Sequence, residues 1–245
     1  MKLAILQASK NLGNTKENPS VGCVIAKNNL LVGAGSTAVN GRPHAEHNAI
    51  NFSKSDLHNS ILYVTLEPCS HSGKTPPCVS KIRKNKIKKV FFSVLDPDIR
   101  SYNKSFKSLR SKGIQTSKGI LSNQLNEFYK SYFKYKKNEL PFLTCKLAVS
   151  KDLFTINKNN KWITNFFSRS RVHLMRSIHD CILTSSETII KDNPMLNCRI
   201  KGLESRSPAR VIIDKNLKTP TSSKIVKSAK KITTIIFYNK TDHKK

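Results

Sequence analysis

Acidic residues are scarce in this chain of 245 residues, where 15 Asp and Glu stand against 44 Lys and Arg and leave a formal net charge of +29. Such an excess indicates a polyanionic partner when the cations gather on one element or in a tail. Here 34 lysines and 10 arginines are spread over the whole chain. We therefore attribute the charge to composition rather than to a nucleic-acid-binding face, and expect it to attract phosphorylated small molecules.

Long apolar runs are missing too. No run approaches the roughly 20 residues of a membrane span, and the stretch Leu3–Leu6 is shorter than a signal peptide and has no small-residue cleavage site after it. We expect neither secretion nor membrane insertion, and a cytoplasmic location. The six cysteines form no dense, regular framework, which predicts thiols or metal ligands rather than disulfides.

Strand and helix signals alternate along the chain, the pattern of a layered α/β protein. Apolar periodicity predicts helices at 2–10, 43–54, 77–85, 105–112 and 121–138, and strands at 21–26, 30–34, 61–66, 89–94 and 114–117. Pro141 opens a new pattern, with strands at 142–148, 181–184, 210–213 and 232–238 and a helix at 166–177. We place the boundary between about 136 and 141, which gives domains 1–138 and 141–245.

Three short segments of the first domain carry an imidazole and two thiols. They are Pro43-His44-Ala45-Glu46, Pro68-Cys69-Ser70-His71 and Thr75-Pro76-Pro77-Cys78. One histidine and two cysteines supply three ligands to Zn²⁺ and leave a fourth position for water, as in catalytic sites. Zinc lowers the pKa of bound water from about 15.7 to about 7, and a nearby carboxylate can carry the released proton to a leaving amine. The candidate zinc ligands are therefore His44, Cys69 and Cys78, with Glu46 as the proton shuttle.

A single histidine or cysteine is more often a core residue than a ligand. The three in this order, each beside a predicted strand end or helix start, favour zinc. A non-catalytic, zinc-stabilised assembly module is the alternative from another class of function. Glu46 argues against it, because a structural zinc site needs no proton shuttle; we expect Glu67, by contrast, to be structural.

The His-x-Glu…Pro-Cys…Cys arrangement resembles the zinc-dependent nucleobase and nucleoside deaminases. Nucleic-acid deaminases of that superfamily usually have Pro-Cys-x-x-Cys, whereas eight residues separate Cys69 from Cys78 here. This spacing, with the segments 18–23 and 63–67, resembles the bifunctional riboflavin-biosynthesis family of diaminohydroxyphosphoribosylaminopyrimidine deaminases and 5-amino-6-(5-phosphoribosylamino)uracil reductases. Deamination of a nucleoside or of a base in tRNA is the alternative among enzymes.

The resemblance implies a three-layer, cytidine-deaminase-like fold that deaminates 2,5-diamino-6-(5-phosphoribosylamino)pyrimidin-4-one. By position, Asn18 would contact the pyrimidine, and His71 and Lys74 the ribose 5-phosphate. Asn103 and Ser105 stand where the family has glycines, which leaves the geometry of this substrate loop undetermined. As partners we expect the phosphorylated pyrimidine and further copies of the chain, with no nucleic acid and no membrane.

Residues 141–214 resemble the reductase half, whose fold is like dihydrofolate reductase. By position, Ala148, Trp162, Thr188 and Asp192 would contact NADPH, and Arg176, Leu196 and Arg199 the substrate, since two guanidiniums suit a phosphate. Without the resemblance, Trp162 and Leu196 would be assigned to a core and both arginines to the surface.

The second half also departs from its family. Lys151-Asp152-Leu153 replaces Leu-Asp-Gly, and a later Glu-Gly-Gly segment is not found before Lys245. We therefore expect deamination as the main activity, with an incomplete, partial reductase-like domain. A separate polypeptide that carries the missing portion, a scaffold role for the domain, and a truncated sequence all remain open.

Overall fold

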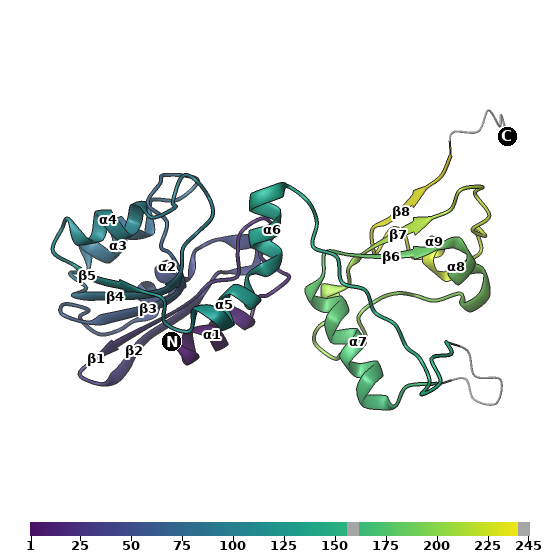
Figure 1. Cartoon of the computed structure of the whole chain (residues 1–245), viewed down its shortest axis with the longest axis horizontal. Coiled ribbons are helices and arrows are strands. Elements are labelled where there is room, and N and C mark those ends of the chain that lie inside the picture. The colour runs from purple at the N-terminus through teal and green to yellow at the C-terminus, as the bar shows by residue number, and fades with distance from the viewer. Residues whose placement is uncertain (156–161, 240–245) are drawn as a thin grey trace. The chain divides into compact units, whose positions relative to one another are not determined.

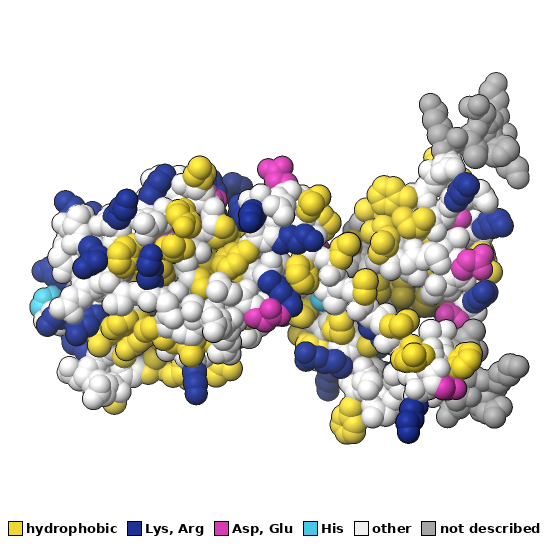
Figure 2. All heavy atoms as spheres, viewed as in Figure 1, with side chains coloured by type: hydrophobic (Ala, Val, Ile, Leu, Met, Phe, Trp, Pro, Cys, Tyr) yellow, Lys and Arg dark blue, Asp and Glu magenta, His cyan; other side chains and the backbone are white. Residues whose placement is uncertain are grey.

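A computed structural model describes residues 1–155 and 162–239. The chain divides between Thr144 and Cys145 into two compact units, and each has its own sheet and core (Figure 1). None of the helices within the described ranges is long and apolar enough to cross a membrane. On the face drawn in Figure 2, Lys and Arg side chains are scattered over both units rather than gathered into one patch, as the even spread of charge along the chain predicts.

The first unit is built on a five-stranded sheet in the order β2-β1-β3-β4-β5. Its strands are β1 (Gly22–Lys27), β2 (Leu30–Ser36), β3 (Ile61–Leu66), β4 (Lys89–Val94) and β5 (Gln115–Lys118). β1 is antiparallel to β2 and β3, whereas β3, β4 and β5 are parallel. The central strands are buried on both faces, which explains why their sequences are almost continuously apolar.

Helices cover both faces of this sheet. Figure 1 shows α2 (Ala45–Phe52), α3 (Cys78–Lys84) and α4 (Lys104–Arg110) on one face, and α1 (Lys2–Ser9) and α5 (Ser122–Phe128) on the other. A Cβ on Gly35 would lie 2.4 Å from the backbone nitrogen of Ala49, so only glycine lets α2 approach β2 this closely. The expected three-layer arrangement is confirmed, and the close approach brings the start of α2 over the sheet.

The predicted helix over 121–138 is interrupted. It forms as α5 and α6 (Lys130–Asn138), with Tyr129 between them outside helical geometry. The buried hydroxyl of Tyr129 donates to the Ser20 carbonyl at 3.1 Å and bonds the Thr65 hydroxyl at 2.6 Å. These long-range bonds account for the break, which apolar spacing alone does not signal.

The second unit has a three-stranded parallel sheet in the order β6-β7-β8. Its elements are α7 (Phe166–Ile178), β6 (Cys181–Ser185), α8 (Ser186–Asp192), β7 (Ala209–Ile213), α9 (Lys224–Lys227) and β8 (Thr234–Phe237), and short 3₁₀ turns lie at Val39–Gly41 in the first unit and Glu204–Arg206 in the second. The predicted strand at 142–148 is wrong: this segment has no regular structure, and Leu143 and Leu147 are exposed. No strand in the described parts of the chain pairs with it, so it has no partner to order it.

Candidate metal centre and active site

The imidazole and the two thiols converge at one end of the first sheet. His44 is the N-cap of α2, Cys78 is the first residue of α3, and Cys69 follows the carboxyl end of β3. His44 Nδ1 lies 3.5 Å from Cys69 Sγ and 3.4 Å from Cys78 Sγ. The three ligand atoms all lie within 4.8 Å of one another, so segments up to 34 residues apart present their donors to one point.

These separations fit zinc. Zn–N bonds of about 2.0 Å and Zn–S bonds of about 2.3 Å in a tetrahedron place nitrogen and sulfur about 3.5 Å apart, which is close to both distances found here. Three protein donors of this type leave one coordination position open. The donor set is therefore that of a catalytic zinc site rather than of a closed structural one.

The two thiols differ in acidity before any metal binds. The pKa of Cys69 is lowered to about 4, first by the hydrogen bond from the Cys78 thiol and then by His44, against the opposing effect of burial. The backbone N–H of Cys78, at the start of α3, also donates to Cys69 Sγ at 3.3 Å. The pKa of Cys78 is raised, first by its bond to Cys69 and then by burial. One thiolate and one thiol thus share the site, together with an imidazole whose pKa the bond to Cys69 raises.

Glu46 is buried in the first turn of α2, beside the ligands. Burial is the main cause that raises the pKa of its carboxyl to about 7, and the charge of Cys69 adds to it. A carboxyl with a pKa near neutrality exists in both protonation states at pH 7, as a group that accepts and returns a proton must.

Glu67 is the anchor of the loop after β4. Its buried carboxylate accepts hydrogen bonds from the Asn103 backbone N–H at 3.0 Å and the Ser105 hydroxyl at 2.5 Å, with longer ones from the N–H groups of Asp96 and Phe106. Asn103 adopts the left-handed conformation (φ 54°), which asparagine tolerates better than most residues. Of the two residues that replace glycines, Asn103 therefore keeps a positive φ in the loop, and Ser105 adds a hydrogen bond to Glu67.

The predicted substrate residues lie around this centre. His71 Nδ1 bonds the Ser101 hydroxyl at 3.0 Å and so links the segment between the cysteines to the loop that Glu67 holds. Lys74 is exposed at the tip of a turn in that segment. Asn18 donates to the Gly41 carbonyl at 3.3 Å, three residues before His44. Their contacts with substrate stay predictions.

Sequence reasoning missed Arg42. Its guanidinium Nη1 donates to the Thr75 hydroxyl at 2.5 Å, so an arginine next to the His44 segment reaches the segment between the cysteines. A basic residue two positions before a predicted metal ligand was the available signal.

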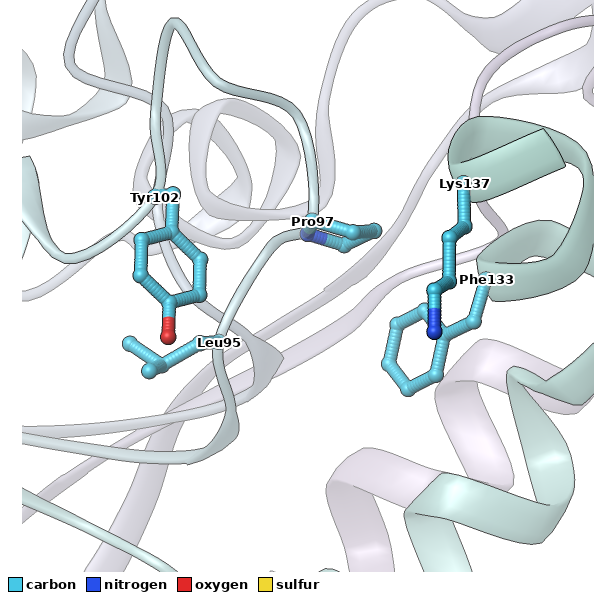
Figure 3. A pocket seen from close by; sticks show the side chains of 5 residues that line it. All are labelled: Leu95, Pro97, Tyr102, Phe133 and Lys137. Atoms are coloured by element: carbon cyan, nitrogen blue, oxygen red, sulfur yellow. The ribbon is translucent and has the colours of Figure 1, made fainter.

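A shallow groove of about 320 Å³ borders the same loop (Figure 3). It is lined by Leu95, Pro97, Tyr102, Phe133 and Lys137. The loop contributes the first three of these residues and α6 the other two. None of the zinc-binding candidates lines the groove, so it is separate from the metal centre.

In the second unit the structure brings Arg176 and Arg199 to one histidine. His173 Nδ1 lies 3.1 Å from the Asn197 carbonyl, and its Nε2 lies 3.1 Å from Arg199 Nη2. Arg176 Nη1 donates to the same carbonyl at 3.1 Å. Burial and the charge of Arg199 lower the pKa of Arg176. Two cations held this closely form a place for an anion.

Of the remaining predictions in this unit, Leu196 is 8% exposed and packs in the core with Ile189, Ile212 and Ile225. This is the core placement that the residue type alone suggests. Trp162 is exposed, with the Arg169 guanidinium 4.7 Å from its ring. Thr188 and Asp192 lie one turn apart on α8, and Ala148 lies outside regular structure. Their roles in NADPH binding stay predictions.

Comparison with known proteins also finds two separate parts in the chain. The model of the cytidine and deoxycytidylate deaminase zinc-binding region matches residues 1–94, and that of the RibD C-terminal domain matches residues 141–245. The riboflavin biosynthesis protein RibD of Aquifex aeolicus is 37% identical over 238 residues, which are 96% of this chain and 67% of that protein. That of Bacillus amyloliquefaciens is 39% identical over 228 residues, which are 92% of this chain and 61% of that protein.

A crystal structure from Thermotoga maritima, of a diaminohydroxyphosphoribosylaminopyrimidine deaminase/5-amino-6-(5-phosphoribosylamino)uracil reductase, is 33% identical. It superposes with a TM-score of 0.91 over 100% of this chain and 70% of that one. The chain therefore spans about two thirds of the length of these relatives. The first unit carries the zinc-binding deaminase region, the second has the RibD C-terminal fold, which is like dihydrofolate reductase, and the chain belongs to the RibD family of riboflavin-biosynthesis proteins.

Proposed function

We propose that the first domain, residues 1–138, hydrolyses 2,5-diamino-6-(5-phosphoribosylamino)pyrimidin-4-one to 5-amino-6-(5-phosphoribosylamino)uracil and ammonia. The observation that carries this proposal is the convergence of His44, Cys69 and Cys78 beside the buried carboxyl of Glu46. The family membership and the activities named for the Thermotoga maritima relative support the choice of substrate.

His44, Cys69 and Cys78 would hold the metal in this mechanism. Zinc, when bound there, makes a coordinated water molecule acidic near neutral pH. Glu46 would accept a proton from the hydrolytic water as the water oxygen attacks the amino-bearing carbon, and would deliver a proton to the adjacent ring nitrogen. A second transfer through Glu46 gives the departing amine its proton, so that the C–N bond breaks, a C=O bond forms and ammonia leaves. A pKa of about 7 suits both directions of transfer.

Substrate is positioned by the segments around the centre. Asn18 presents a side-chain amide, which both donates and accepts hydrogen bonds at a base edge. The phosphorylated end is assigned to His71 and Lys74, which lie on the segment between the cysteines. The bond from His71 to Ser101 and the Glu67 network support this arrangement, because they tie the segment between the cysteines to the loop after β4.

For the second unit we propose a phosphate-binding role for Arg176 and Arg199, which His173 brings together. Within the residues that the structure describes, Arg176 Nε is buried without a hydrogen-bond partner, which leaves a donor for an anion. The cofactor contacts of Ala148, Trp162, Thr188 and Asp192 remain part of this proposal. Leu153 stands where the family motif has glycine and adopts a φ of 67°, a conformation that costs about 1 kcal/mol or more for a residue with a side chain. The family motif Leu-Asp-Gly is altered here to Lys151-Asp152-Leu153, and we expect deamination without efficient NADPH-dependent reduction.

The test is product analysis with zinc-loaded protein. Incubation with the diaminopyrimidine phosphate should release ammonia and the uracil product, and added NADPH should yield no ribityl product. Both products are identified by mass. Ribityl product from this chain would overturn the expectation for the second unit. Inosine formation in tRNA without turnover of the small pyrimidine would favour the nucleic-acid alternative.

Glu46→Gln separates catalysis from metal binding. It should keep one zinc per chain and lower ammonia release by about a thousandfold or more, because proton transfer is lost. Glu127→Gln, the same chemical change at an exposed position, is the matched control and should retain full turnover. Unchanged ammonia release by the Glu46 variant would remove the mechanism.

A further inference from the structure

Arg42 lies against the segment that joins the two cysteines. Its Nη1 donates to the Thr75 hydroxyl at 2.5 Å, and its Nη2 lies 3.6 Å from the position of a Cβ on Gly73. The Gly73 N–H bonds the Thr75 carbonyl at 3.3 Å and closes a tight turn. The guanidinium therefore runs along this turn, and Lys74 is at its tip.

The charge of Arg42 is not neutralised within the described residues. None of the ion pairs found there includes Arg42 or Lys74. Arg42 is two residues before His44, so it lies next to the metal centre in the chain. A guanidinium has several N–H donors in a fixed fork, of which the bond to Thr75 uses one. In the described part of the chain this half-buried fork has free donors, a neighbouring lysine and no paired carboxylate, so it is a site for an anion.

We propose that Arg42, with Lys74, binds the phosphate monoester of the substrate and so selects phosphorylated pyrimidines. This inference rests on the proposed deamination. The fork can bond two phosphate oxygens at once, and Lys74 adds a mobile point charge. Because the phosphate is remote from the reacting carbon, Arg42 contributes to binding and selection rather than to proton transfer.

A different role would follow if Arg42 only clamped the turn through Thr75. Thr75→Val separates the two, because it removes the clamp bond and leaves the guanidinium in place. Arg42→Gln removes both the clamp and the charge, whereas Arg42→Lys keeps the charge and loses the fork. Arg83→Gln is the matched control, since Arg83 is an exposed arginine on α3.

The first measurement is binding of ribose 5-phosphate by calorimetry, which requires no turnover. It uses zinc-loaded protein in which Arg176→Gln and Arg199→Gln remove the phosphate site proposed in the second unit. Arg42→Gln should weaken binding about tenfold or more, as expected for a lost charge-assisted bond of about 1.4 kcal/mol or more. Arg42→Lys should fall between Arg42→Gln and the unchanged protein. Thr75→Val and Arg83→Gln should bind within about twofold of the unchanged protein.

The second measurement is steady-state deamination of the phosphorylated substrate and of its dephosphorylated analogue. Arg42→Gln should raise KM for the phosphorylated substrate much more than it lowers kcat, and should change KM for the analogue far less. Equal ribose 5-phosphate affinity in Arg42→Gln and the unchanged protein overturns the inference, as does a Thr75→Val variant that behaves like Arg42→Gln. Absence of ammonia release by the unchanged protein would overturn the proposed function instead, and the calorimetry would still decide the role of Arg42.

Discussion

The two units bury their sheets in different ways. In the first, helices cover both faces of the sheet, and Leu62, Val64, Val90 and Phe92 are fully buried in the central strands. In the second, alternate side chains of three parallel strands face solvent, with Leu183 61%, Ile213 49% and Phe237 58% exposed. Figure 2 shows hydrophobic side chains gathered at the surface of this unit. Parallel sheets are usually covered on both faces. In the described structure the second sheet is covered on one face only.

The centres of the two units also differ in chemistry. Phe92 occupies the core of the first unit among apolar neighbours, whereas Arg210 is fully buried in the second. The Arg210 guanidinium donates to the carbonyls of Ile225 and Ile232 at 2.9 Å and to the Thr234 hydroxyl at 2.7 Å. Apolar packing positions the metal centre of the first unit, and directed hydrogen bonds join β7 to β8 and α9 in the second. This contrast predicts how the activity and the stability of each unit respond to metal removal, to substitutions and to pH.

Removal of zinc should have the largest effect, and it should act on the activity and the thiol reactivity of the first unit. A chelator should abolish deamination and make Cys69 the thiol of the metal site that alkylates first, because its pKa of about 4 leaves it a thiolate at pH 6 while the raised pKa of Cys78 keeps that group protonated. Mass spectrometry after iodoacetamide treatment should show Cys69 modified at least about tenfold faster than Cys78. Exposed Cys181 in the second unit is the internal control. Equal labelling of Cys69 with and without zinc would contradict the assignment.

A matched pair of substitutions tests the difference between the first sheet, which is covered on both faces, and the second sheet, which has an open face. Phe92→Ala should lower the free energy of unfolding of the first unit by about 3–5 kcal/mol, because it leaves a cavity in a closed core. Phe237→Ala, at a residue 58% exposed, should cost the second unit less than about 1 kcal/mol. Urea unfolding followed for each unit measures both. Similar losses would show that the open face of the second sheet is covered in solution.

Arg210→Lys tests the buried guanidinium. Lysine cannot reach all the partners of Arg210, so buried carbonyls lose their donors and the second unit should lose roughly 2–4 kcal/mol of unfolding free energy. Arg171→Lys, an exposed position on α7, should change it by less than about 0.5 kcal/mol. Equal stability of the two variants in urea unfolding would show that Arg210 does not organise this core.

The smallest expected effect is a pH dependence in the first unit. Burial raises the pKa of Asp96 from 3.8 to about 6, so the folded state holds its proton more tightly than the unfolded chain. The resulting stability is complete below pH 3.8 and is lost as the pH rises through about 6. Asp96→Asn should remove a difference on the order of 2 kcal/mol between pH 4 and pH 7. Asp180→Asn, at an exposed site in the second unit, should leave the pH dependence of the unfolding free energy unchanged. The same pH dependence in the Asp96 variant and the unchanged protein would contradict the prediction.

Several features could be predicted because they depend on local spacing. The strand at 89–94 is found with the predicted bounds, and α7 differs from its predicted range by one residue. The zinc ligands could be named from residue type and order, since few side chains bind zinc and each stood beside a strand end or helix start. The break at Tyr129 and the missing strand at 142–148 could not, because each depends on partners distant in the chain.

The amino-acid sequence by itself determined the alternation of strands and helices and the residue types of the metal centre. These depend on hydrophobic periodicity and on the coordination chemistry of side chains, both of which are local properties. Only the tertiary structure decided that Arg42 reaches Thr75, that Glu67 holds Asn103 and Ser105, and that Arg210 is buried. A polar side chain has many possible partners along a chain, and the packing of the sheet against its helices selects which of them comes within hydrogen-bonding distance.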